Sequence, residues 1–311
     1  MKIILMGSPD FVVPIFDRLA DEHEVAAVFT RAPKPVGRKN ILTQTPVHIW
    51  AEGRGLPVYT SIRDFPPTVR ASADCPPSRG GHATPPVDYI IVVAYGVILK
   101  QNVLDFATCV NVHYSLLPKY RGAHPVAAAI MNGDTQTGVC LQKMVLELDA
   151  GDIFMSEKFP IGENDTTEEL RVKASDIAAD MLIKFLDAPN DYPPVPQIGE
   201  VTFATKAIGE DTVIDWKKTP LEIHNQVRAI GGRTVINGIE VKVLKTRVLR
   251  RDDTPTQDFV SGKAANEIYP APASGGRGEA LQIVMVQPAG KKPMAWKDFV
   301  NGQRGKIVFS D

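Results

Sequence analysis

The sequence has few cysteines, no long apolar run and no recognisable metal-binding pattern. Its three cysteines, Cys75, Cys109 and Cys140, are odd in number and widely spaced, so neither a disulfide framework nor a zinc site is expected. The six histidines form no H-E-x-x-H pattern, and we predict no metal. No apolar run approaches the roughly 20 residues of a membrane-spanning helix, and the apolar stretch that follows Lys2 is too short for a signal peptide. These absences predict a cytoplasmic protein.

The length and the distribution of charge indicate more than one domain. A chain of 311 residues exceeds what one hydrophobic core usually serves. Residues 206–311 carry 17 Lys and Arg against 12 Asp and Glu, whereas residues 1–205 carry 18 against 24. Because basic side chains neutralise phosphates, the basic C-terminal third suggests a polyanionic partner. A solvated basic surface would explain the charge equally well.

Strand and helix patterns alternate through residues 1–186. Apolar runs predict strands at 2–6, 24–30, 56–59, 89–94, 110–113, 139–144 and 154–159, and amphipathic patterns predict helices at 11–19, 46–52, 127–132 and 166–186. This alternation predicts an α/β domain with a Rossmann-like, doubly wound, mostly parallel sheet. The first turn, GSPDF at 7–11, lacks the G-x-G-x-x-G pattern, so no dinucleotide cofactor is expected.

The composition changes after residue 186. Residues 187–205 hold a proline-rich stretch that favours extended backbone and is predicted to be a linker. One helix pattern at 220–230 and short strand patterns at 233–236, 239–249 and 281–286 then predict a small β-barrel domain over 206–311. Residues 70–86, rich in Pro, Gly and Ser, are predicted to form a loop.

The densest cluster of reactive side chains follows the strand predicted at 110–113. Alternate side chains of a strand share a face, so Asn111 and His113 should point the same way, together with Ser115 if the strand continues. Parallel sheets bind ligands at the carboxyl ends of their strands. An amide beside an imidazole suits a carbonyl that becomes an oxyanion. By itself, however, such a histidine is more often structural, and the L-D-A-G-D sequence at 148–152 is more often an ordinary turn.

Taken together, these two segments resemble the formyltransferases that use 10-formyltetrahydrofolate. That family carries N-x-H-x-S-L-L-P-x-x-x-G, here at 111–122, followed by L-D-x-G, here at 148–151. Further segments resemble the branch of the family that formylates methionyl-tRNA: MGSPDF at 6–11, PVGRK at 35–39, VAYGVIL at 93–99, YRGA at 120–123, IDW at 214–216 and QPAGKK at 287–292. The resemblance implies a Rossmann-like domain followed by an OB-like β-barrel that contacts tRNA.

The resemblance also implies roles for individual residues. Asn111 and a protonated His113 would donate hydrogen bonds to the oxyanion, and Asp149 would sit near His113 and help to move protons. Ser115 would order its loop rather than act as a nucleophile. The formyltetrahydrofolate co-substrate would contact two segments that together comprise Val93, Ala94, Tyr95, Gly96, Ile98, Ser115, Leu116, Leu117 and Pro118.

The expected partner is methionyl initiator tRNA, bound by a monomer. Its phosphates would meet basic side chains, namely Arg31, Lys34, Arg38, Lys39, Lys206, Lys291 and Lys292. The acceptor would enter past Ser8, Pro9, Phe11 and Arg121. The chain departs from the family at 230–233, where IGGR replaces the usual F-N-P-W-P, and at His124. Two alternatives stay open: a formyltransferase acting on a small amine, such as glycinamide ribonucleotide or an amino sugar-nucleotide, and a nucleic-acid-binding protein without activity.

Overall fold

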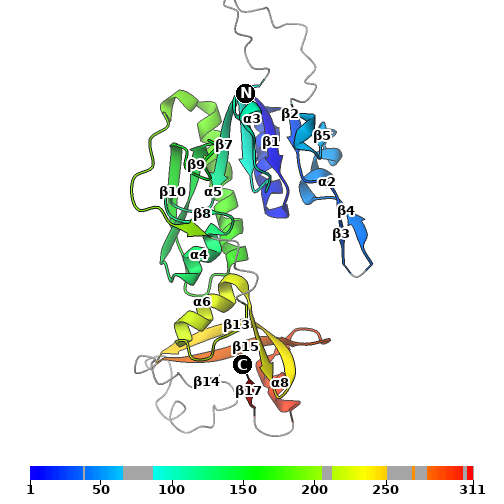
Figure 1. Ribbon diagram of the computed structural model, residues 1–311, viewed down its shortest axis with the longest axis vertical. Coiled ribbons are helices and arrows are strands. Elements are labelled where there is room, and N and C mark those ends of the chain that lie inside the picture. The colour runs from blue at the N-terminus through cyan, green and yellow to red at the C-terminus, as the bar shows by residue number, and fades with distance from the viewer. Residues whose placement is uncertain are drawn as a thin grey trace, which may run out of the picture. The chain divides into compact units, whose positions relative to one another are not determined.

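The computed structural model describes residues 1–37, 39–65, 87–204, 212–250, 268–269, 279–303 and 307–310 (Figure 1). The chain forms two compact units. Unit 1 comprises Met1–Gly122, Thr137–Phe159 and Arg171–Phe203, and unit 2 comprises Ala123–Gln136, Pro160–Leu170 and Ala204–Asp311. The loop predicted at 70–86 lies outside the described residues.

A seven-stranded sheet in the order β10-β9-β7-β6-β1-β2-β5 forms the centre of unit 1. Its strands are β1 (Lys2–Gly7), β2 (Glu24–Phe29), β5 (Val58–Tyr59), β6 (Tyr89–Val93), β7 (Thr108–His113), β9 (Gln136–Lys143) and β10 (Ile153–Pro160). The first five pair in parallel, and β9 joins β7 antiparallel. The chain runs outward from β1 to β5 and then returns to β6 on the other side of β1. The predicted doubly wound, mostly parallel sheet is therefore confirmed.

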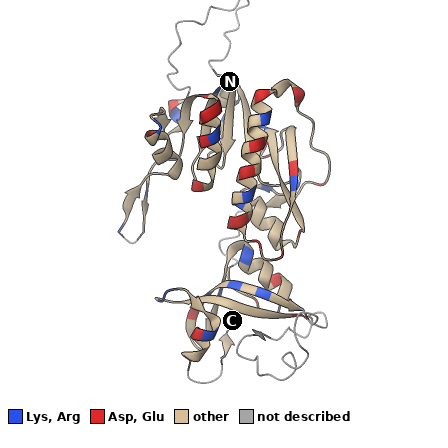
Figure 2. Ribbon diagram, turned by 180° about the vertical axis from the view of Figure 1, so that it is seen from behind, with Lys and Arg blue, Asp and Glu red and all other residues tan. Residues whose placement is uncertain are grey.

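Helices accompany this sheet and complete its core. They are α1 (Val13–Glu22), entered through a 3-10 turn at Asp10–Val12, α2 (Pro46–Gly53), α3 (Gln101–Leu104) and α5 (Thr167–Asp187). Gly7 ends β1 directly against α1, since a Cβ there would lie 2.9 Å from Phe16. The ion pair between Arg18 and Asp180 joins α1 to α5, a helix that carries both basic and acidic residues (Figure 2). In the part of the chain that is described, no helix is long and apolar enough to cross a membrane.

A β-hairpin occupies the basic segment between β2 and α2. Its strands are β3 (Lys34–Val36) and β4 (Ile41–Thr43), paired antiparallel, and Figure 1 shows the hairpin extending away from the sheet. Its apolar side chains are exposed: Ile41 by 62% and Leu42 by 67%. The sequence patterns did not predict these strands, because three-residue strands without a buried face leave no alternation to recognise.

Unit 2 is built on an antiparallel sheet in the order β14-β15-β13-β12-β17, with β16 added to β15. The strands are β12 (Gly232–Ile236), β13 (Ile239–Arg250), β14 (Ile268–Tyr269), β15 (Glu279–Pro288), β16 (Met294–Ala295) and β17 (Phe309–Ser310), and the helices are α4 (Pro125–Met131), α6 (Pro220–Ile230) and α8 (Trp296–Asn301). Asn237 and Gly238, both at positive φ, make the tight turn between β12 and β13. A small β domain after the α/β domain is thus confirmed.

The atypical IGGR sequence has a local explanation in unit 2. Gly231 ends α6 at φ 82°, a conformation that favours glycine. Gly232 begins β12 so close to Ile214 that a Cβ there would lie 2.6 Å from its side chain. Two successive glycines therefore let the helix turn directly into a buried strand.

Candidate active site

Asn111 and His113 lie on β7, near the carboxyl ends of the parallel strands. Asn111 is half-buried, and in the described part of the chain its side-chain amide has no hydrogen-bond partner. His113 is only 5% exposed. Across the β7–β9 pair, Asn111 lies opposite Gln142, and His113 lies opposite Cys140. Burial raises the pKa of Cys140 to about 11, so this neighbouring thiol stays protonated.

Both ring nitrogens of His113 face acceptors. Nε2 donates to the main-chain oxygen of Tyr120 at 2.9 Å, because a carbonyl oxygen can only accept. Nδ1 lies 3.6 Å from Oδ2 of Asp149. Burial lowers the pKa of His113 below its ordinary value, although Asp149 and the Tyr120 carbonyl act in the opposite direction.

The resemblance implies a protonated His113 during the reaction, whereas burial disfavours the charged ring in the free protein. With its pKa lowered by burial, the ring is neutral in the free protein at neutral pH. The proton on Nε2 leaves the lone pair of Nδ1 directed toward a carboxylate. A proton taken up at Nδ1 during a reaction would at once have Asp149 as its counter-ion.

The Asp149 carboxylate is held by two donors from outside its own turn. Its Oδ2 accepts a hydrogen bond from the Gly122 N–H, and its Oδ1 accepts one from Nε2 of Gln142, each at 2.8 Å. Asp149 itself has φ 49°, a left-handed conformation that Asp tolerates better than most residues. A Cβ at Gly151 would collide with the main-chain oxygen of Lys143. The L-D-A-G sequence thus meets the steric demands of this turn.

Gln142 is a site residue that the sequence did not indicate. Its Nε2 holds Asp149, whereas its buried Oε1 has no hydrogen-bond partner in the described part of the chain. An unpartnered buried oxygen normally costs free energy, which a ligand donor would relieve. Only the strand register brings Gln142 opposite Asn111, and no local pattern reports that register.

The segment after β6, where the co-substrate was predicted to bind, presents main chain to solvent. Ala94 and Gly96 have positive φ, and Ile98 is 89% exposed. Among the described residues, the N–H groups of 96–98 find no main-chain or side-chain acceptor. Tyr95 is buried, which raises its pKa to about 12 and excludes it from acid–base chemistry near neutral pH.

The loop after β7 is ordered by its own side chains. The Ser115 hydroxyl donates to the main-chain oxygen of Lys119 at 2.6 Å, in agreement with the ordering role predicted for it. Leu117 and Pro118 are buried, and Leu116 packs against Gly138 of β9.

Two of the residues predicted at the acceptor entrance are buried and have hydrogen-bond partners within unit 1. Ser8 is 1% exposed, and its hydroxyl contacts the Tyr95 oxygen and the Arg31 N–H, which ties the ends of β1, β2 and β6 together. Arg121 is also buried, and its guanidinium binds Glu147 and Gln197. Pro9 and Phe11, by contrast, are partly exposed.

The basic side chains predicted to contact phosphate are exposed in the part of the chain that the structure describes. They carry no ion pair within the described chain and comprise Arg31, Lys34, Lys39, Lys291 and Lys292. Arg38 and Lys206 lie outside the described residues.

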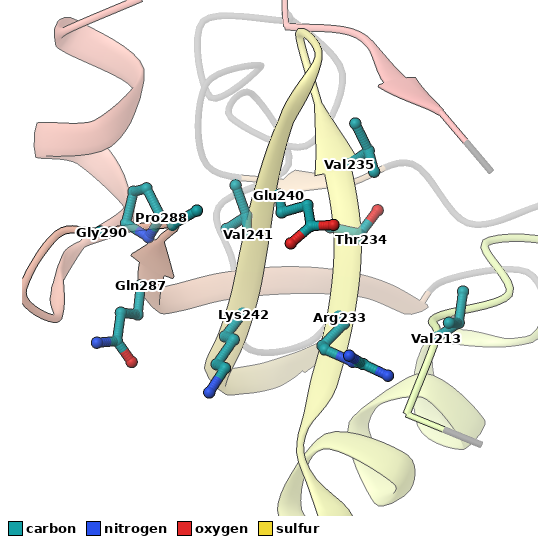
Figure 3. Close-up of a pocket in the computed structure, with 11 residues that line it drawn as sticks. Val213, Arg233, Thr234, Val235, Glu240, Val241, Lys242, Gln287, Pro288 and Gly290 are labelled. Atoms are coloured by element: carbon teal, nitrogen blue, oxygen red, sulfur yellow. The ribbon is translucent and has the colours of Figure 1, made fainter. Parts of the chain in front are cut away.

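A cavity of about 480 Å³ opens on the sheet of unit 2, beside β12, β13 and β15 (Figure 3). Two of its lining residues, Arg233 and Lys242, lie directly opposite each other on paired strands, and Gln287 follows in the same row. Like charges placed opposite each other destabilise a sheet. No carboxylate of the described chain forms an ion pair with either, although Glu240 lines the same cavity. The sequence did not predict this basic row.

Comparisons with known proteins identify the family of the chain. The family model described as "Formyl transferase" matches residues 1–186, and the one described as "Formyl transferase, C-terminal domain" matches residues 207–304. Methionyl-tRNA formyltransferase of Cereibacter sphaeroides is 36% identical over 97% of this chain and 96% of its own length. That of Anaplasma phagocytophilum is 37% identical over 99% of both chains.

Solved structures support the same fold. The sugar 3N-formyl transferase WlaRD superimposes with a TM-score of 0.66 at 19% identity, covering 94% of this chain and 99% of that one. Methionyl-tRNA formyltransferase from Clostridium thermocellum gives 0.53 at 19% identity, covering 79% and 93%. The matched family models and the full-length relatives together show that the chain belongs to the formyltransferase family.

Proposed function

We propose that this protein transfers a formyl group from 10-formyltetrahydrofolate to the α-amine of methionyl initiator tRNA. The observation that carries the proposal is the Asn111 amide, which has no hydrogen-bond partner among the described residues, beside the His113–Asp149 pair, in a chain similar over nearly its whole length to methionyl-tRNA formyltransferases. Asn111, His113 and Asp149 are the proposed catalytic residues. The protein would act in the cytoplasm as a monomer.

The geometry suggests how these residues divide the work. The amine attacks the formyl carbon, and the carbonyl oxygen becomes an oxyanion that accepts a hydrogen bond from the Asn111 amide. Nδ1 of His113 takes the proton that the amine loses, directly or through a water molecule. Asp149 stabilises the imidazolium, which then returns the proton to the departing N10 of the folate. The formyl group changes nitrogen, and no covalent enzyme intermediate is required.

The donor would bind along the segments after β6 and β7. The N–H groups at 96–98, which have no acceptor in the part of the chain that the structure describes, offer donors to the acceptors on a pterin edge. The exposed side chain of Ile98 offers an apolar contact. Because these groups belong to the main chain of one loop, recognition depends on the positive φ of Ala94 and Gly96 more than on side-chain identity.

The tRNA would contact basic groups in both units. The hairpin carries Lys34 and contains Lys39 in its turn, and Arg31 precedes it. In unit 2, a phosphate placed between Arg233 and Lys242 would relieve their repulsion across the sheet. Lys291 and Lys292 complete the described candidates, and Arg38 and Lys206 stay predictions from the sequence.

A small amine acceptor is the second candidate, since the sugar formyl transferase WlaRD shares the fold. The basic hairpin and the basic row of unit 2 favour tRNA, because a small acceptor needs neither. The test is formylation of purified methionyl initiator tRNA with 10-formyltetrahydrofolate, with Asn111→Ala and His113→Ala beside the parent. We expect turnover by the parent and a loss of about 10²–10³ in each variant. Turnover on an amino sugar-nucleotide alone would overturn the acceptor assignment.

A further inference from the structure

Residues 195–202, in the proline-rich stretch predicted to be a linker, are bound to the loops that carry the proposed catalytic groups. Val195 pairs with Ile153 through two main-chain hydrogen bonds, of 2.8 and 3.0 Å. Two residues further along, Gln197 reaches the Asp149 turn. The predicted linker therefore lies against the site within unit 1, at least as far as Phe203.

The side-chain amide of Gln197 uses all of its hydrogen-bonding capacity on the Asp149 turn and on Arg121. Its Nε2 donates to the main-chain oxygens of Asp149 and Gly151, both at 2.8 Å. Its Oε1 accepts from Arg121, at 3.3 Å from Nε and 2.8 Å from Nη2. Arg121 extends the chain of contacts to Glu147, at the beginning of the turn. One half-buried amide thus joins three separate segments.

A second residue of the same segment holds the other side of the imidazole. The Thr202 hydroxyl accepts from the Tyr120 N–H at 2.9 Å, and its main-chain oxygen accepts from the Arg121 N–H. Tyr120 has φ 60°, an uncommon conformation for a bulky residue, and its own carbonyl accepts from His113. Residues 197 and 202 therefore bracket His113 through Asp149 and Tyr120 respectively.

We propose that Gln197 is a positioning residue for formyl transfer, which fixes the Asp149 turn relative to His113 while it is anchored to Arg121. This inference rests on the proposed roles of His113 and Asp149. Only an amide supplies two donors and an acceptor at this reach: a carboxylate would face two carbonyl oxygens, and a lysine could not accept from Arg121. Residues 195–202 of the predicted linker are accordingly part of the active-site framework of unit 1.

The test compares Gln197→Ala and Gln197→Glu with Gln101→Ala. Gln101 is a matched control because its amide also makes a side-chain hydrogen bond, to Asp105 one helical turn further along, and not to any of the proposed catalytic residues. For both Gln197 variants we expect kcat to fall by about 10–100-fold, as a small displacement of a catalytic group would cause. The KM for methionyl-tRNA should stay within about twofold of the parent value, because no proposed tRNA contact changes. Gln197→Glu keeps the size of the side chain and its contact with Arg121. A loss of activity in this variant would therefore show that the hydrogen bonds donated to the Asp149 turn are the ones that matter.

A second measurement needs no substrate. The titration of His113, followed by NMR on the full-length protein, should move to lower pH in Gln197→Ala, because a released Asp149 favours the imidazolium less. Gln101→Ala should titrate like the parent. An unchanged titration together with unchanged kcat in Gln197→Ala would overturn the proposal, and so would a loss of activity that only follows a loss of folded protein. If the parent formylated no tRNA, the proposed function would fail, whereas the titration would still decide the role of Gln197.

Discussion

Replacing Asp149 by Asn tests the centre of the proposed mechanism. At the observed 3.6 Å, a charged Asp149 and a protonated His113 attract by about 4–5 kcal/mol at an effective dielectric constant near 20, which is an upper limit. The Asp149 carboxylate already accepts hydrogen bonds from Gly122 and Gln142, and these reduce its net attraction for the imidazolium. We therefore expect kcat to fall by about 10²–10³, within the usual range for proton-transfer catalysis.

The neighbouring carboxylate provides the control. Asp152 belongs to the same L-D-A-G-D sequence, but no contact of its side chain with His113 exists in the structure, so Asp152→Asn should stay within about threefold of the parent rate. An amide in place of the Asp149 carboxylate would leave either the Gly122 N–H or the Gln142 amide without an acceptor, at a cost of about 1–3 kcal/mol in unfolding free energy. Single-turnover formylation should therefore be measured where circular dichroism shows both variants folded. An Asp149→Asn rate above one-tenth of the parent rate, or equal losses in the two variants, would refute the reasoning.

Three further outcomes are expected. Gly151→Ala should lower the unfolding free energy in urea by about 2–4 kcal/mol, because its Cβ would collide with the last carbonyl of β9, and an unchanged midpoint would contradict the turn geometry. Burial lowers the pKa of His113 and of His224 in the folded protein, so the unfolded state binds more protons. The contribution of these histidines to stability should therefore be complete above their ordinary pKa of about 6.5, and stability should fall as the pH drops from about 7 toward 5. His224→Gln should make thermal unfolding depend less on pH in this range. The double variant Arg233→Ala and Lys242→Ala should reduce the salt slope of tRNA binding by about 2, with an unchanged KM for the folate, whereas a parental slope would remove this row from the tRNA interface.

Local patterns in the sequence were sufficient for most of the sheet and for placing Asn111 and His113 on one face, whereas the catalytic roles proposed for Asn111, His113 and Asp149 came from the family resemblance. Strand alternation placed Asn111 and His113 on one face, and the apolar runs predicted most strands of the sheet to within a few residues. A strand and the faces of its side chains depend on residues that are close in the sequence, so a local sequence pattern predicts them.

Contacts between distant segments could not be predicted in this way. Gln197 meets Arg121 across 76 positions and the Asp149 turn across 48, and its own segment showed only prolines and polar residues. Gln142 joins the site through strand register. The lowered pKa of His113 also depends on burial by the whole fold, which no local sequence pattern reports.

The buried thiols beside the site offer a way to observe its opening. Burial raises the pKa of Cys109 to about 12 and that of Cys140 to about 11, so neither forms the thiolate that alkylating agents require. Both lie on strands that hold the active site, β7 and β9. A pulse of iodoacetamide should therefore label these positions only in molecules whose two strands have separated. Peptide mass spectrometry of that labelling would measure how often β7 and β9 separate, with no substitution in the protein.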